Sequence, residues 1–173
     1  GVQTCALPIY SAMINKMAAA CNIQISQHVS PAWGKNAIPV NYYSTEGSVP
    51  KDAAKLYIFD DSDQAGTLGW HSETIGGVVF GKVFARTILD YGLPILFDSR
   101  RKNELTVSSV VSHEALELFC NPYVSLWSDG PEISEGSEYA YETCDPVEAN
   151  RGLLIGRRSC TNPYADDVPI GTK

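Results

Sequence analysis

The most constraining feature of this sequence is an apolar pattern between Leu105 and Asn121. Pro122 disfavours helical geometry at the residue before it, so a helix here should end at about Cys120 or Asn121. A helix that is apolar almost all round is mostly buried, and charged groups on it then need partners. The pattern itself consists of apolar residues at three- and four-residue steps, which predict an amphipathic helix: Val107, Val110, Val111, Ala115, Leu118 and Phe119.

The same helix carries a histidine and two glutamates. His113 and Glu117 are four positions apart and project from one side, with Glu114 beside them. Zinc takes nitrogen and oxygen ligands in a tetrahedron, and two such positions supply two of its corners. The residue after the first ligand can take a proton from a water molecule held by the metal, as in H-E-x-x-H helices. The H-E-x-x-E pattern alone is weak, because exposed helices often carry His and Glu, but the apolar surroundings favour a metal.

A third ligand must come from another segment. The acidic residues Glu142, Asp145 and Glu148 follow one another at three-residue steps. Glu142 is favoured because its apolar and aromatic neighbours indicate burial, while an acidic loop in water is the alternative for all three. The thiol of Cys120, one turn beyond Glu117, and the imidazole of His28 are weaker candidates, since a buried cysteine is usually a core residue.

Several further motifs resemble a little-characterised family from tailed bacteriophages and bacteria, usually described as zincin-like metallopeptidases. The resemblance runs from about Gln24 to Glu148. It implies a zinc-dependent peptidase-like domain, with His113 and Glu117 as ligands and Glu114 as base. Two features depart from the family: Asn121 stands where Asp is more frequent, and the region after Ala149 lacks the usual aromatic and proline-rich ending. The matching motifs are Pro31-Ala32-Trp33-Gly34, Asp60-Asp61, Leu68-Gly69-Trp70-His71, Gly81-Lys82-Val83-Phe84, Ser112-His113-Glu114-Ala115-Leu116-Glu117, Asn121-Pro122 and Glu142-Thr143-Cys144-Asp145-Pro146-Val147-Glu148.

Length and charge restrict the function classes. A chain of 173 residues suits one domain, which we place at residues 10–150. The net charge of -7 argues against nucleic acid and anionic membranes as partners. No apolar run approaches the roughly 20 residues that span a bilayer, and no signal peptide is visible, which predicts a cytoplasmic or virion-associated protein. Residues 1–9 resemble a translated sequencing adapter, residues 151–173 form an irregular tail, and the cysteines show no C-x-x-C, which favours reduced thiols.

The remaining segments predict a small mixed sheet with helices packed on one side, an α+β, zincin-like architecture. A helix is expected over Tyr10–Ile25, with His28 on the surface just past it and Ser30-Pro31 as the end of the segment that follows the helix. The aspartates at 60, 61 and 63 indicate an acidic strand end, because the calcium-loop spacing is missing. We expect strands over Ala37–Tyr43, Lys55–Phe59 and Gly76–Arg86, the last as the sheet edge for an extended peptide, then a linker over Val124–Gly136.

These observations lead to a zinc-dependent metallopeptidase-like hydrolase as the first hypothesis. Zn²⁺ would bind His113, Glu117 and Glu142, Glu114 would act as general base on a peptide or protein substrate, and His71 or Tyr141 would stabilise the oxyanion. The alternative is a non-enzymatic phage virion or assembly protein in which a fourth protein ligand, Asp145 or Cys120, closes a structural metal site. A cysteine hydrolase that pairs Cys144 or Cys120 with His113 is disfavoured, because neither thiol has a convincing nucleophile setting.

Overall fold

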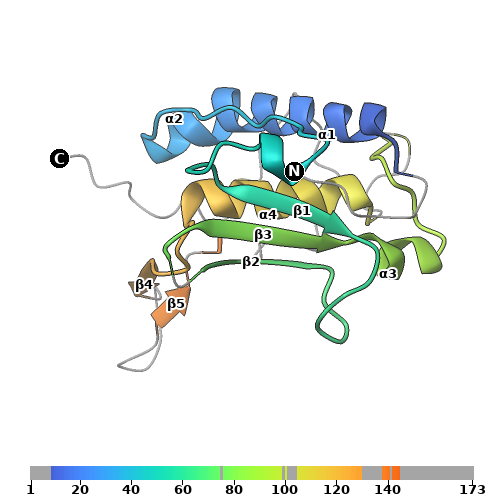
Figure 1. Cartoon of the computed structure of the whole chain (residues 1–173). Helices are drawn as coiled ribbons and strands as arrows, with labels where there is room; N and C mark the ends of the chain where they lie inside the picture. Colours follow the sequence, from blue (N-terminus) through green and yellow to red (C-terminus); the bar gives the residue numbers. More distant parts are fainter. Residues whose placement is uncertain are drawn as a thin grey trace.

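The computed structural model describes residues 9–74, 76–98, 100, 105–129, 138–140 and 142–144, the backbone alone at 128, 129 and 138–140. Three layers are stacked in it (Figure 1). Helix α1 (Ser11–Gln24) and its continuation form the first, helix α4 (Val107–Cys120) the second, and a three-stranded mixed sheet the third. The fold is therefore α+β with helices on one side of a small mixed sheet, as the sequence predicts.

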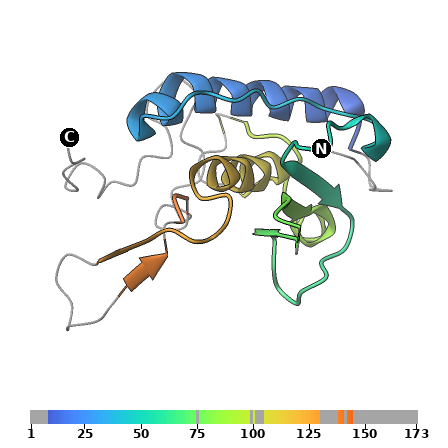
Figure 2. The same cartoon turned by 60° about the vertical axis from the view of Figure 1, so that its left-hand side comes forward.

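Helix α4 lies in the middle layer, between α1 and the sheet (Figure 2). Thr106 caps its N-terminus: the side chain accepts a hydrogen bond from the Ser109 N–H, and the Ser109 hydroxyl accepts one from the Thr106 N–H. The helix ends at Cys120, before Pro122, as predicted. Contact on two sides explains why α4 is apolar almost all round and why Glu114 and Glu117, each 3% exposed, are buried with it.

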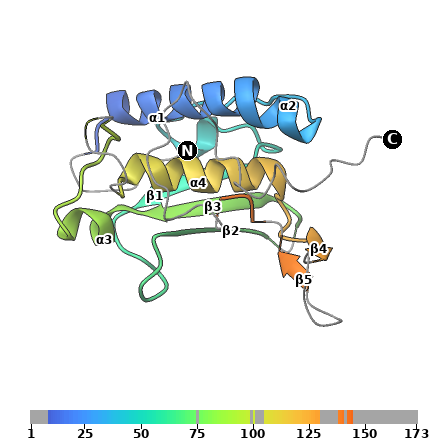
Figure 3. The same cartoon turned by 180° about the vertical axis from the view of Figure 1, so that it is seen from behind.

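The sheet contains β1 (Lys55–Phe59), β2 (Gly69–Glu73) and β3 (Val79–Phe84) in the order β1-β3-β2. Strand β1 pairs with β3 in parallel and β2 pairs with it antiparallel. The prediction that β3 forms the edge for a peptide is wrong, because β3 is the central strand and hydrogen-bonds on both sides. Strand β2 is instead an edge of the sheet in the described structure, on the side of β3 away from β1 (Figure 3), and it also contacts α4. The sequence predicted strands over Lys55–Phe59 and Gly76–Arg86 but none between them, where β2 lies.

The N-terminal helix is longer than predicted. Helix α1 continues through a π-helical turn, η1 (Ile25–Val29), into α2 (Ser30–Trp33). Pro31 does not end this helical run, and it lies directly after the π-helical turn, where the backbone hydrogen-bond pattern changes. The helix ends instead at Gly34, whose φ of 60° is left-handed. His28 accordingly lies within the helical run, half-buried, rather than beyond it.

The predicted strand over Ala37–Tyr43 does not form. This segment is extended but lies against α1, where the side chain of Asn22 takes the place of a neighbouring strand. Asn22 Oδ1 accepts a hydrogen bond from the Val40 N–H at 2.7 Å, and its Nδ2 donates to the Val40 carbonyl at 2.7 Å. The backbone groups are thus satisfied by one side chain, without a ladder.

Replacement of Asn22 by alanine is expected to lower the free energy of unfolding by about 2 kcal/mol, because two hydrogen bonds to a half-buried backbone are lost. Denaturant unfolding followed by circular dichroism measures this difference. Asn15→Ala is the matched control, since the Asn15 side chain is exposed and bonds only within its own helix, to the Ser11 carbonyl. Equal effects of both substitutions would contradict the role assigned to Asn22.

A two-stranded hairpin follows α4. Strands β4 (Trp127–Asp129) and β5 (Glu138–Ala140) pair antiparallel, so part of the predicted linker is a strand. Asn121 directs the chain there, because its buried Oδ1 accepts hydrogen bonds from the N–H groups of Ser125 and Leu126. Among the described residues, no helix has the length and apolar character needed to cross a membrane. Cys21, Cys120 and Cys144 are all buried and in no disulfide within this part of the chain.

Candidate metal centre

A cavity of about 230 Å³ lies between α4 and β2, and its walls carry most of the predicted site residues. Its acidic and basic side chains all come from these two elements and from the segment 142–144. No lysine or arginine of the described chain is among the residues that line it. The lining residues are Gly69, Trp70, His71, His113, Glu114, Glu117, Val124 and Glu142.

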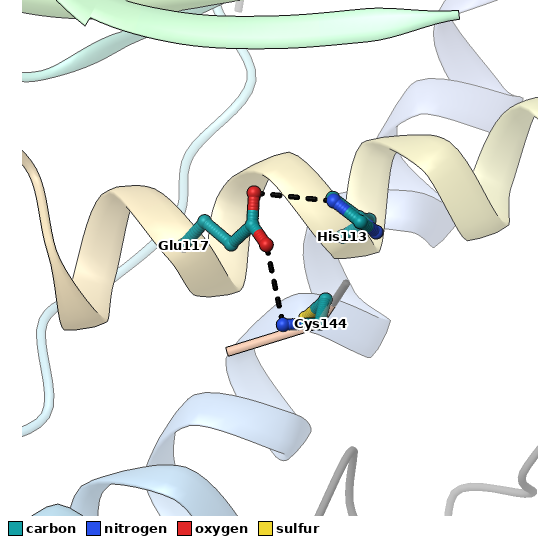
Figure 4. Close-up of side chains that lie close together, drawn as sticks. All are labelled: His113, Glu117 and Cys144. Carbon is teal, nitrogen blue, oxygen red and sulfur yellow. Dashed lines mark hydrogen bonds and ion pairs between the residues drawn. The ribbon is translucent and has the colours of Figure 1, made fainter. Parts of the chain in front are cut away.

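Glu117 is the central side chain of this site (Figure 4). One carboxylate oxygen, Oε2, lies 3.1 Å from His113 Nε2, as expected for residues four apart on a helix. The other, Oε1, accepts a hydrogen bond of 3.2 Å from the Cys144 N–H. His113, Glu117 and Cys144 each offer one ligand atom, and the three atoms lie within 4.8 Å of one another, close enough to hold a common metal ion.

His71 reaches the same carboxylate from strand β2. Its Nδ1 lies 3.6 Å from Glu117 Oε2 and 3.6 Å from Glu114 Oε2, and these atoms form a second group within 4.8 Å. On the other side of the ring, Nε2 lies 3.3 Å from the Asn121 carbonyl oxygen and 3.8 Å from Glu142 Oε2. The two groups therefore share Glu117 and differ in their histidine.

Burial and charge shift the proton affinities of this cluster. Burial raises the pKa of Glu114, although His71 and His113 act in the opposite direction. Burial lowers the pKa of His71, but the interaction with Glu114 and the charges of Glu142 and Glu117 outweigh it, so the pKa of His71 is raised. A carboxyl with a raised pKa is a stronger base than an ordinary glutamate, which suits Glu114 to proton transfer near neutral pH.

Gly69 provides the space in which Glu114 lies. A Cβ atom at this position would meet Glu114 Oε1 at 2.6 Å and the Lys82 carbonyl oxygen at 3.0 Å. The 2.6 Å distance is shorter than side chains tolerate, so the Glu114 carboxylate would have to move, and the Lys82 carbonyl of the neighbouring strand would have to shift by a few tenths of an ångström. A residue without a side chain at position 69 therefore lets the carboxylate of Glu114 lie against β2.

The structure brings together His71, His113, Glu114, Glu117 and Glu142, all of which the sequence pointed to. Glu142 lines the cavity and faces His71, and neither group of potential ligands in the described chain includes it. Cys144 joins one group instead, although sequence analysis considered it only as a nucleophile. Its position could have indicated a ligand, because its thiol lies two positions after Glu142, in the segment that was expected to supply the third ligand.

The weaker candidates lie elsewhere or outside the described residues. Cys120 is fully buried among Leu116 and Phe119 in an apolar cluster. Neither Cys120 nor His28 belongs to a metal-ligand group in the described part of the chain. Tyr141, Asp145 and Glu148 lie outside the described residues.

The aspartates after β1 have partners of their own. Arg86 contacts Asp60 at 3.4 Å and Asp61 at 2.6 Å, and Lys82 contacts Asp63 at 2.6 Å. These contacts fit the acidic strand end expected from the sequence.

Comparisons of the chain with protein-family models, with curated proteins and with solved structures give no match. The function is therefore argued from the residues of the site.

Proposed function

We propose that the protein is a zinc-dependent hydrolase that cleaves peptide bonds in the cavity between α4 and β2. One observation carries this proposal: His113 and Glu117, a pair of potential ligands on one helix, share a cavity with the buried carboxylate of Glu114. In this arrangement the helix supplies two metal ligands and, between them, a base.

The donor set fits zinc. Imidazole, carboxylate and thiolate are the ligands that zinc accepts in proteins, whereas magnesium and calcium select oxygen. His113 and Glu117 would hold the ion, and Cys144 or Glu142 would complete the set. Zinc bound there would supply Lewis acidity, which brings the pKa of water near neutrality and polarises a carbonyl.

The protein residues would perform the proton transfers and position the substrate. Glu114 would accept a proton from the attacking water and deliver it to the leaving amine. His71 would donate a hydrogen bond from an imidazole N–H to the developing oxyanion. Strand β2 is a sheet edge in the described structure, and an extended peptide can add to such an edge through main-chain hydrogen bonds. This edge supports a peptide as the substrate.

The competing proposal is a structural metal site in a non-enzymatic protein, which Cys144 favours. If Cys144 and a fourth protein ligand both bind the ion, no coordination position remains for water. Zinc content and cleavage of a denatured protein mixture distinguish the two proposals. A hydrolase loses cleavage when a chelator removes the metal and regains it when zinc is added. Zinc retained without cleavage would support the structural site, and purified protein without zinc would contradict both.

Gly69→Ala is expected to reduce cleavage by roughly 100-fold while zinc stays bound, because the added methyl group displaces the Glu114 carboxylate. The measurement is the rate of cleavage together with zinc content and thermal unfolding. Gly47→Ala serves as control, since nothing lies within 4 Å of a Cβ at that position. Full activity of a folded Gly69→Ala protein would show that the position of Glu114 against β2 does not matter.

A further inference from the structure

The second ligand group, His71, Glu114 and Glu117, has a geometry that the single zinc site does not explain. His71 Nδ1 lies 3.6 Å from both Glu114 Oε2 and Glu117 Oε2. These distances exceed those of hydrogen bonds. Zinc bonds of about 2.0–2.2 Å at tetrahedral angles separate two ligand atoms by roughly 3.4 Å, which is close to the spacing observed.

The hydrogen bond on the other side of the imidazole fixes which nitrogen carries a proton. The Asn121 carbonyl can only accept, so His71 Nε2 must donate to it. In the neutral ring, Nδ1 then presents its lone pair to Glu114 and Glu117. Two carboxylates repel this lone pair unless a cation lies between them. A histidine that binds a metal through one ring nitrogen typically donates the N–H of the other nitrogen to a carbonyl, as His71 Nε2 does to Asn121.

Glu114 adds an independent observation. Its residue is 3% exposed, and its Oε2 is buried with no hydrogen-bond partner in the described structure. Buried carboxylate oxygens without partners are costly. A metal ion beside His71 Nδ1 would give Glu114 Oε2 the partner that it lacks in the described structure, and the acidic side chains of Glu117 and Glu142 line the same cavity.

We propose that His71, Glu114 and Glu117 bind a second divalent metal ion, with Glu117 shared between the two positions. This proposal rests on the proposed function, because the first ion is the one held by His113 and Glu117. The second ion inhibits cleavage, since a Glu114 carboxylate that binds metal no longer accepts a proton. The protein is thereby active with one zinc ion and inactive with two.

Zinc titration of metal-free protein, followed by calorimetry and native mass spectrometry, tests this proposal. The wild type is expected to bind two ions, the second more weakly, and cleavage is expected to fall as the second position fills. His71→Ala and Glu114→Gln each lose one ion and keep the other, while His113→Ala keeps only the one at His71. His28→Ala, at a histidine on the π-helical turn that belongs to neither ligand group in the described structure, is expected to keep two ions and is the matched control.

The outcomes separate this proposal from the proposed function. Wild-type protein that binds one zinc ion, lost in His113→Ala and kept in His71→Ala, overturns the second position and leaves the hydrolase standing. Two ions retained in both His71→Ala and Glu114→Gln also overturn it. Wild-type protein that binds no zinc contradicts both proposals. Circular dichroism of each variant shows whether it is folded, and Glu114→Gln gives the same test should His71→Ala fail to fold.

Discussion

Glu114→Gln is expected to lower the rate of peptide cleavage by about 10²–10⁴-fold, the usual contribution of a general base. Glutamine has nearly the shape of glutamate and keeps a hydrogen-bonding oxygen, but it cannot accept the proton of the attacking water. The cavity shape should be preserved, and zinc bound at the site proposed for His113 and Glu117 should stay bound. The measurement is the cleavage rate of a denatured protein mixture at equal zinc content.

The matched control for this substitution is Glu73→Gln. Glu73 is an exposed residue at the end of β2, the same strand that carries His71. Glu73→Gln makes the same chemical change as Glu114→Gln but outside the cavity, so full activity is expected. If Glu114→Gln cleaves as fast as the wild type, Glu114 is not the base and the proposed mechanism is wrong.

Glu117→Gln is expected to abolish zinc binding, because Glu117 is the one side chain common to both ligand groups. Loss of a residue that only hydrogen-bonds a metal ligand weakens metal binding by roughly 10–100-fold, and loss of a charged ligand itself should weaken it further. Zinc content after dialysis and affinity against a competing chelator measure the effect, and cleavage is expected to disappear with the metal.

The amide oxygen of the substituted side chain would still accept the hydrogen bond that the Cys144 N–H donates to Glu117, so the Glu117→Gln protein should fold. Glu73→Gln again provides the control and should keep its zinc. A Glu117→Gln protein that retains zinc with wild-type affinity would show that the metal lies elsewhere, and the site would then have to be reassigned.

Local sequence patterns predicted the elements whose residues interact within one segment. Helix α4 followed from its apolar periodicity and from Pro122, and strand β1 from its run of large apolar residues. Strand β2 was not predicted, since its sequence, Gly69-Trp70-His71-Ser72-Glu73, has no run of large apolar residues. Its strand geometry comes from pairing with β3, and its glycine from contact with Glu114. Interactions between distant segments override local preference in both cases.

The site residues were predictable where they lie on one segment. The helix itself places His113, Glu114 and Glu117 together, so their spacing in the sequence was enough to predict that they share a site. Cys144 was not predictable in this way, because its position depends on a backbone hydrogen bond to Glu117, 27 residues earlier in the chain. The strand assigned to Ala37–Tyr43 failed for a similar reason, since nothing in that segment indicates that Asn22 satisfies its backbone.

The C-terminal end of α4 is hydrogen-bonded by a residue far away in the sequence. Lys35, which follows α2, donates hydrogen bonds to the carbonyls of Cys120 at 2.6 Å and Phe119 at 3.3 Å. A cation at this pole of a helix opposes fraying of the last turn. Lys35 therefore fixes the last turn of α4, which directly follows Glu117, and a displacement of the N-terminal layer would loosen the turn that positions this proposed ligand.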